Sequence, residues 1–295
     1  MGATARNLWR VTEPFHQLAY RSPEAVAAYE AIGLRVAPHQ YFASRLAAAG
    51  EVTHGVAVSL LFGFAPDYVA QAVPDVWSIV DAKSVVDART KGAELTLRRI
   101  LGDAWNGSEI ERASAIAQDM IQQLSFAGKP MAAAQNDVPQ PELAGLQLWR
   151  ACTILREYRG DAHWAATAAA GIDAVECHIL HAADGAMPED LLHRVTGWND
   201  PEWEAAKERL RSRGLLINSG TNLELTDAGI EVKLFIEHST DSGSSSPVSV
   251  AGEKQTTELI ELMKPWVSAI MDADVIGAWK MREQLWRDLP AVKNV

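Results

Sequence analysis

Apolar residues recur at helical spacing along most of the chain, whereas the strict alternation that marks a half-buried strand is scarce. Alanine is abundant, which also favours helices. Helices that end at glycine or proline are predicted over residues 22–31, 38–49, 55–63, 66–72, 84–101 and 108–127. The three prolines between Lys129 and Pro141 predict a connection. The first half of the chain is therefore expected to be helical.

The second half repeats this plan and adds a short β-hairpin. Further helices are predicted over residues 141–158, 161–170, 172–179, 188–195, 199–213 and 253–271. Gly160 is expected to allow a tight turn, and Asp161 to cap the helix that follows it. Two short strands around Asn218-Ser219-Gly220-Thr221 are typical of the wing of a winged helix. The predicted fold is mainly α, with one small hairpin.

Several positions coincide when the two halves are compared at an offset of 121 residues. Leu34-Arg35 falls on Leu155-Arg156, and Trp77 falls on Trp198. The run Ala47-Ala48-Ala49-Gly50 falls on Ala168-Ala169-Ala170-Gly171. These matches predict an internal duplication of two winged-helix-like halves about a pseudo-two-fold axis, in which only the second half keeps its wing.

The pattern divides the chain into four predicted parts. Residues 1–140 form a degenerate winged-helix-like half, and residues 141–238 form the winged-helix half. Residues 239–252 are rich in Ser and Gly, so a flexible loop is expected there. Residues 253–295 are expected to form C-terminal helices that pack on the body, because the tail carries Trp279 and Trp286.

Charge lowers the expectation of DNA binding. The 295 residues carry a formal net charge of −11, and an acidic protein repels phosphate unless its bases are segregated on one face. Residues 186–238 contain ten acidic and six basic residues. The helix that would enter the major groove begins with three carboxylates, and its first base is Lys207. A winged helix kept as a packing unit is therefore favoured over one that binds DNA.

The two cysteines, Cys152 and Cys177, belong to no CxxC pair and are expected to be small buried thiols in a reducing cytoplasm. No signal peptide is visible at the start of the chain. The longest apolar run, from Gly55 to Ala65, is too short to cross a bilayer, so no membrane partner is expected. The chain is expected to be a monomer or a homodimer.

A polar cluster within residues 155–163 is the main candidate for chemistry. It contains Arg156, Glu157, Arg159, Asp161 and His163. One interpretation is structural, since arginine–carboxylate pairs often join helices. The other adds Glu176, which lies between Ile172 and Ile179 on a helix face and is expected to point inward. A buried acid beside histidine and arginine suits acid–base catalysis, with His163, Glu176 and Asp161 as the catalytic candidates.

The corresponding segment of the first half supplies the opposite wall of the expected pocket. Ligand-binding candidates there are Tyr41, Phe42, Arg45 and His54, and Trp164 and His181 complete the set from the second half. These residues predict a concave, partly apolar pocket between the halves for an acidic or hydroxylated small molecule.

Metal and cofactor sites have less support. His163, Glu176 and His181 could converge on a metal, but HExxH and clustered Cys/His motifs are absent from the sequence, so no metal is predicted. No cofactor is predicted either, and haem has no specific support. The motifs GxGxxG after a strand, GxxxxGK[ST] and GxSxG are also absent, so nucleotide binding and elbow-type serine hydrolysis have no support.

The same residues carry a family resemblance. Leu155-Arg156-Glu157, Gly160-Asp161 and His163, followed by Ala170-Gly171-Ile172-Asp173 and His181-Ala182-Ala183, resemble an actinobacterial helix-turn-helix family of unassigned function. Its members are often labelled MarR-like. The likeness covers roughly residues 12–240 and includes Gly197-Trp198 and Leu225-Thr226. His54 departs from the family pattern. The resemblance implies the fold far better than it implies a function.

These observations predict a small-molecule-binding helical protein, and leave open whether it is a cofactor-independent acid–base enzyme of a biosynthetic pathway. The first alternative is a ligand-responsive winged-helix regulator of transcription. The second is a non-catalytic accessory protein that uses the same pocket for recognition.

Overall fold

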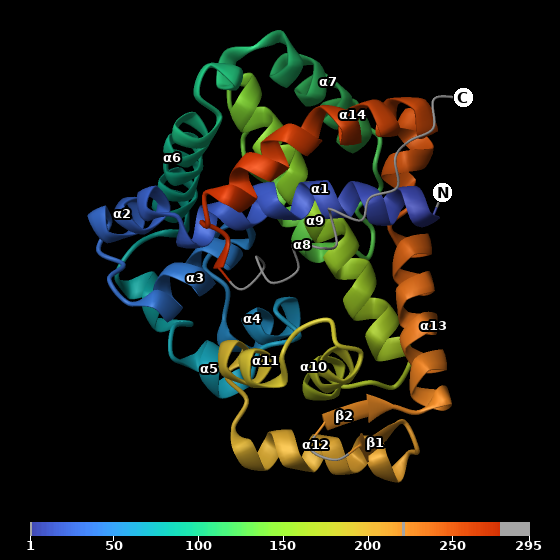
Figure 1. The fold of residues 1–295 in the computed structure, drawn as a ribbon. Helices are drawn as coiled ribbons and strands as arrows, with labels where there is room; N and C mark the ends of the chain where they lie inside the picture. Colours follow the sequence, from blue (N-terminus) through green and yellow to red (C-terminus); the bar gives the residue numbers. More distant parts are fainter. Residues whose placement is uncertain (1, 220–221, 278–295) are drawn as a thin grey trace.

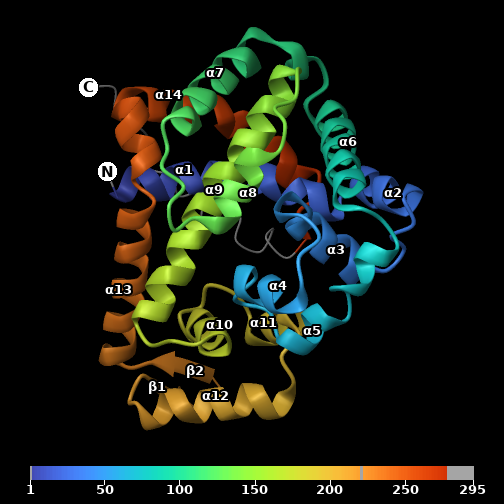
Figure 2. The same cartoon turned by 180° about the vertical axis from the view of Figure 1, so that it is seen from behind.

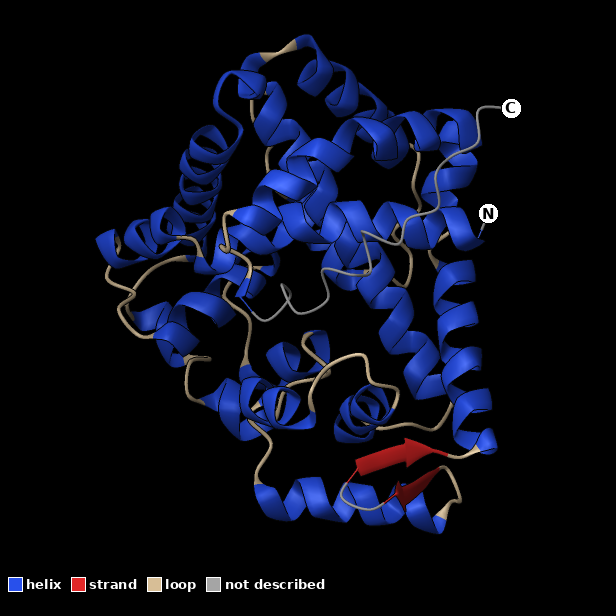
Figure 3. Cartoon of the chain, in the orientation of Figure 1, coloured by secondary structure: helices blue, strands red, loops and turns tan. Residues whose placement is uncertain are grey.

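The structure is a computed structural model that describes residues 2–219 and 222–277 (Figure 1). Helices dominate this part of the chain, and its two strands form a single hairpin (Figure 3). The mainly α fold with a small wing is thus confirmed. The elements are α1 (Gly2–Arg21), α2 (Pro23–Ala31), α3 (Ala37–Leu46), η1 (Ala47–Ala49), α4 (His54–Leu60), α5 (Pro66–Ala70), η2 (Asp75–Ser78), α6 (Ala82–Leu101), η3 (Gly102–Asn106), α7 (Ser108–Gln122), α8 (Pro130–Asp137), α9 (Ala144–Ala169), α10 (Ala174–Ala183), α11 (Glu189–Thr196), α12 (Asp200–Ser212), β1 (Leu216–Ser219), β2 (Asn222–Leu225), α13 (Asp227–Gly243) and α14 (Ser246–Asp272).

The long helix α9 is the central element of the fold. It contacts α1, α7, α8 and α13, which surround it along its length (Figure 2). Leu148, Cys152 and Leu155 recur at helical spacing and are buried, so this side of α9 joins the main core. Residues from α1 to α14 share that core, in which α1 packs on α9 and α14 packs on α1 and α7.

Buried apolar residues form three clusters. The first joins α1, α7, α9 and α14, and the second lies within residues 25–131. The third belongs to the winged helix, where Trp203 and Leu210 of α12 pack beneath α10. The hairpin pairs Leu216 with Leu225 across β1 and β2. The internal duplication and its pseudo-two-fold axis stay predictions.

The prediction of a flexible loop at residues 239–252 is wrong, because α13 continues to Gly243 and α14 begins at Ser246. Three polar side chains here, Thr240, Asp241 and Ser244, are buried and hydrogen-bonded. Thr240 Oγ1 donates to the carbonyl of Ile236 at 2.7 Å, and Ser244 Oγ donates to that of Thr240 at 2.7 Å. Asp241 accepts a 2.7 Å hydrogen bond from Arg159 of α9. The hydroxyl bonds satisfy buried polar groups, and the bond from Arg159 ties the segment to α9, so it is ordered although it has little apolar surface.

Two further expectations about helix boundaries are wrong. Residues 130–137 form α8 where a connection was expected, and Pro130 occupies its first turn, where proline is tolerated. Helix α9 runs through Gly160 without a turn, so Asp161 does not cap a new helix. Its carboxylate instead accepts from the backbone N–H groups of Met131 and Ala132 at 3.4 and 3.0 Å. Asp161 thus caps α8 across the helix interface.

The C-terminal region packs on the body through α14, which contacts α1 and α7. A kink with φ of 79° at Gly252 interrupts α14, next to the predicted start of the last helix at residue 253. The tail with Trp279 and Trp286 lies outside the described residues. Every helix within residues 2–219 and 222–277 is too short or too polar to span a membrane.

The contact between α2 and α6 depends on a glycine. A Cβ at Gly92 would lie 2.6 Å from the Cα of Ala25. Because backbone atoms cannot move aside, we expect Gly92→Ala to lower the free energy of unfolding by about 1–3 kcal/mol in urea denaturation. A Cβ at Gly55 in α4 would meet no atom within 4 Å. Gly55→Ala should therefore change stability by less than about 1 kcal/mol. Equal losses in both variants would contradict this account.

Candidate functional site

A cavity of about 980 Å³ lies beside α9 and is lined by residues of α1, α3, α5, α10, α11 and α13. This volume is at the upper end of the range of sites that hold small molecules. On α9 the lining residues follow helical spacing, as expected of one helix face: Arg156, Arg159, Gly160, His163 and Trp164. Glu157 and Asp161 are not among them. The polar cluster is therefore split between two faces of α9.

Glu157 is at the centre of a buried ion network that joins three helices. Its side chain is 2% exposed and accepts from Arg156 Nη1 at 2.7 Å. Arg45 Nη2 of α3 lies 3.0 Å from the same carboxylate. Arg156 Nε also donates to Glu13 of α1 at 3.1 Å. Burial alone would raise the pKa of Glu157, but Arg156 and Arg45 outweigh it and hold the pKa below its ordinary value.

His16 of α1 lies against this network. Its Nε2 is 3.1 Å from the hydroxyl of Tyr20 and 3.7 Å from the Glu157 carboxylate. Burial, then Arg156 and Arg45, lower the pKa of His16 well below its ordinary value. The ring is therefore neutral near pH 7, which avoids a further buried positive charge.

A second ion network fixes Arg159. Its Nη1 donates to Asp241 Oδ1 at 2.7 Å and to Ser244 Oγ at 3.1 Å. Arg6 Nη2 of α1 donates to the same Asp241 carboxylate at 2.7 Å. Asp241 does not line the cavity, but Glu237 does, and its carboxylate lies 3.6 Å from Arg159 Nη2, so Arg159 is at the cavity wall between two acids. This network joins α1, α9 and α13.

Asp161, a catalytic candidate from sequence, caps α8 and does not line the cavity. Burial raises the pKa of Asp161 to about 6, although the backbone N–H groups that it accepts from oppose this shift.

Glu176 is buried, as expected, but the prediction that it pairs with Arg156, Arg159 or His163 is wrong. Its carboxylate accepts from Arg209 Nε and Arg213 Nη1, both at 3.1 Å. It also forms a capping box with Asp173 at the start of α10. The inward face of α10 at this point meets α12 rather than α9, so Glu176 stabilises the winged helix.

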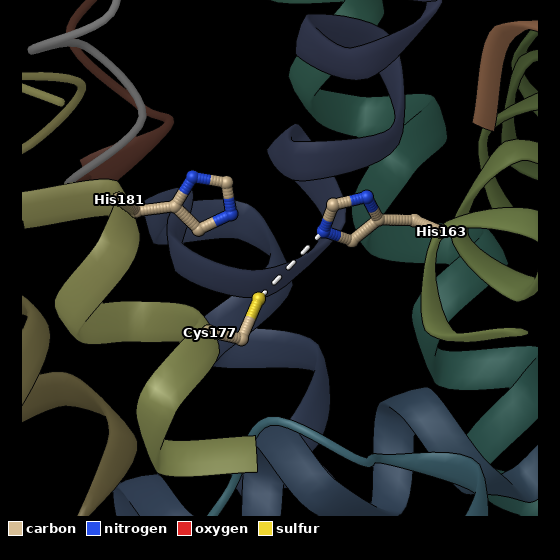
Figure 4. Close-up of side chains that lie close together, drawn as sticks. All are labelled: His163, Cys177 and His181. Carbon is tan, nitrogen blue, oxygen red and sulfur yellow. Dashed lines mark hydrogen bonds between the residues drawn. The ribbon is translucent and has the colours of Figure 1, made fainter. Parts of the chain in front are cut away.

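His163 instead meets Cys177 and His181 (Figure 4). His163 Nε2 lies 3.8 Å from Cys177 Sγ, and its Nδ1 lies 3.2 Å from Thr240 Oγ1. Burial lowers the pKa of His163 to about 3 and raises that of Cys177 to about 12, so both groups are neutral at pH 7. Both cysteines are free and buried, as expected from sequence. Sequence reasoning missed Cys177, although its spacing of four residues from His181 places both on one helix face.

The structure separates the remaining ligand-binding candidates. Tyr41 and Trp164 line the cavity, and Trp164 stacks on Phe62 with ring centroids 5.1 Å apart. Phe42 is fully buried in the second core, and Arg45 is bound to Glu157. His54 is outside the cavity lining, with Nε2 3.0 Å from the carbonyl of Pro66. Residues that sequence reasoning missed line the cavity from α1 and α13: Arg6, Trp9, Arg10, Glu13, Lys233 and Glu237.

The bases of α12, the helix expected to enter DNA, are bonded within the protein. Lys207 lies 3.2 Å from Glu189 and 2.5 Å from Glu204. Arg209 pairs with Asp173 at 2.6 Å, and Arg211 lies 3.4 Å from Glu208. A phosphate would have to compete with these carboxylates for every base on the helix.

A sequence profile described as a helix-turn-helix family matches residues 5–277. Neither the comparison with curated proteins nor the comparison with solved structures found a match.

Removal of the central charge tests the buried network. We expect Glu157→Gln to lower the free energy of unfolding by about 3–5 kcal/mol, because Arg45 and Arg156 lose their buried counter-charge. Urea denaturation at pH 7 measures this loss. Asp87→Asn is the control, since its ion pair with Lys83 is solvent-exposed and its loss should have little effect. A Glu157→Gln protein as stable as wild type would show that the network does not hold the helices together.

Proposed function

Since the chain belongs to a helix-turn-helix family, we propose that it binds a small molecule and that its winged helix forms part of the cavity wall rather than a surface that binds DNA. The proposed ligand is an organic anion with an apolar or aromatic body. The sign of the charge around the cavity is the observation that carries this proposal.

Basic residues outnumber acidic ones in the described lining of the cavity, whereas acidic residues outnumber basic ones in the whole chain. The whole chain has 27 Lys and Arg against 38 Asp and Glu. Among the residues that the structure describes, three acidic ones line the cavity: Glu13, Asp184 and Glu237. The basic lining residues are twice as many: Arg6, Arg10, Arg21, Arg156, Arg159 and Lys233. Walls of low dielectric strengthen the attraction of these cations for an anion.

Two of the arginines are fixed in advance. Glu157 holds Arg156 and Asp241 holds Arg159 from behind the cavity wall, and the lining acids Glu13 and Glu237 hold the same two arginines from within it. An arginine that is already ordered loses little side-chain entropy when it binds a carboxylate, sulfonate or phosphate. The ion networks of α9 therefore support both the fold and the recognition of an anion.

Aromatic side chains supply a surface for the apolar part of the ligand. Those that line the cavity are Trp9, Tyr20, Tyr41, Phe64, Tyr68 and Trp164. Rings of this kind bury large apolar area at low entropic cost. The proposal does not extend to acid–base catalysis by His163 and Glu176, because Glu176 is bonded to Arg209 and Arg213 in the winged helix.

An aromatic sulfonate tests the proposal. We expect anilinonaphthalene sulfonate to bind saturably with one molecule per chain, measured by fluorescence. Arg10→Gln should weaken this binding about tenfold, because it removes one cation from the lining. Lys83→Gln is the matched control, since it removes the same charge from the exposed surface of α6.

N-phenylnaphthylamine, which has the same rings without the sulfonate, should bind equally to wild type and Arg10→Gln. Melting curves establish that all variants are folded. Equal affinity of the sulfonate for wild type and Arg10→Gln would contradict an anion site.

A ligand-responsive regulator is the second candidate, and the family match with the winged helix favours it. The internal ion pairs of α12 favour the cavity-wall role. We therefore expect no retardation of genomic DNA fragments at low salt, and no effect of Arg211→Ala or Arg213→Ala in that assay. Binding that weakens steeply with salt and is lost in these variants would support the regulator. The sulfonate experiment tests the cavity independently of this result.

A further inference from the structure

Three side chains with ligating atoms converge from two helices at the cavity wall. His163 comes from α9, and Cys177 and His181 lie one turn apart on α10 (Figure 4). One nitrogen or sulfur atom of each lies within 4.8 Å of those of the other two. Within the described part of the chain, this is the one group of three or more His, Cys, Asp or Glu residues with such geometry.

We propose that His163, Cys177 and His181 bind one thiophilic divalent metal ion of the zinc class. Two imidazoles and a thiolate are a donor set that suits Zn²⁺, and hard cations such as Mg²⁺ and Ca²⁺ prefer oxygen ligands. Ligand atoms around tetrahedral zinc lie about 3.5 Å apart, from bond lengths of about 2.0–2.3 Å. The 3.8 Å between His163 Nε2 and Cys177 Sγ is already near this value. The ligand nitrogen of His181 lies within 4.8 Å of the other two atoms, so a side-chain movement of about 1 Å would bring it to the same separation.

A hydrogen bond orients His163 for this role. Thr240 Oγ1 donates its own hydrogen to the carbonyl of Ile236 at 2.7 Å, so it accepts from His163 Nδ1 at 3.2 Å. The ring proton is then on Nδ1, and the lone pair of Nε2 points to Cys177. Metal-bound histidines are commonly held by such a bond from the second ring nitrogen.

The ion would be accessible from the cavity. His163 and His181 line it, whereas Cys177 is 3% exposed and lies behind them. Three protein ligands leave a fourth position of a tetrahedral ion for water or for an anionic group of the ligand. Only this fourth-position role rests on the proposed function, since the three protein ligands are sufficient for metal binding. Binding converts the Cys177 thiol to a thiolate and releases its proton to solvent.

Cobalt titration of the chelator-treated protein tests the site. We expect Co²⁺ to bind with one ion per chain and to produce a thiolate-to-cobalt charge-transfer band with the intense visible bands of four-coordinate cobalt. Zn²⁺ should displace it. Cys177→Ser should abolish the charge-transfer band. Cys152→Ser should keep it, because Cys152 is the other buried cysteine and belongs to the main core.

Histidine variants provide a second matched pair. His181→Gln should weaken Co²⁺ binding at least tenfold. His178→Gln should not, because His178 on the same helix bonds to the carbonyl of Gly63 at 2.7 Å. Thr240→Val should weaken Co²⁺ binding about tenfold, because it removes the hydrogen bond that orients His163. This variant retains all three ligands, so it also tests the site if Cys177→Ser does not fold.

Absence of the charge-transfer band in wild type, its persistence in Cys177→Ser, or equal losses in His178→Gln and His181→Gln would each overturn the metal site. The sulfonate titration with chelator present reports on the cavity alone. Failure of the metal site is therefore distinguishable from failure of the proposed ligand site.

Discussion

The structure depends most on the buried carboxylate of Glu157 and the two arginines that neutralise it. Arg45 comes from α3 and Arg156 from α9, and Glu13 of α1 binds the second arginine. Removing these charges from water is costly unless they are paired. Each of the three helices is therefore stable in its position only when the helices that carry its partner charges are also in place. Apolar packing alone would tolerate some sliding of smooth helix faces, whereas paired buried charges specify one arrangement. The three helices that this network joins, α1, α3 and α9, all contribute residues to the cavity lining.

Helix α9 separates structural and recognition roles by its two faces. Glu157 and Asp161 point away from the cavity and fix neighbouring helices. Arg156, Arg159 and His163 lie on the cavity face. Gly160 lies between them, and a Cβ there would lie 3.3 Å from Arg156 Nη1 and 3.4 Å from Glu157 Oε2, so the glycine leaves room for this ion pair beside the helix.

Local pattern was sufficient to predict most helices and the wing, because periodicity and turn chemistry act over short distances. It failed where contacts between residues far apart in the sequence determine the local structure. Gly160 was expected to end a helix, but α1, α8 and α13 pack around α9 and keep it continuous. Residues 239–252 were expected to be a loop, but Arg6 and Arg159 bind Asp241 and order the segment. Helix α1 was missed, although Leu8, Val11, Phe15 and Leu18 recur at helical spacing and are buried. Glu176 and Cys177 are adjacent, and only the packing of α10 decides that the acid faces α12 and the thiol faces His163.

The winged helix illustrates why a family defined by its fold does not fix a function. Its α12 uses Lys207, Arg209 and Arg211 to bind carboxylates of its own chain, which leaves no base on that helix without an internal competitor. Its other elements supply the cavity, since His178 and His181 come from α10, Leu192 from α11 and Lys233 from α13. If the same module were to bind DNA, α12 would have to break several internal pairs while the protein carries a net charge of −11. The cavity bases are also paired with carboxylates, but Arg156 and Arg159 are ordered by those pairs at the cavity wall, and six basic residues line it against three acidic ones within the described chain. The charge distribution therefore favours recognition inside the protein over recognition at its surface.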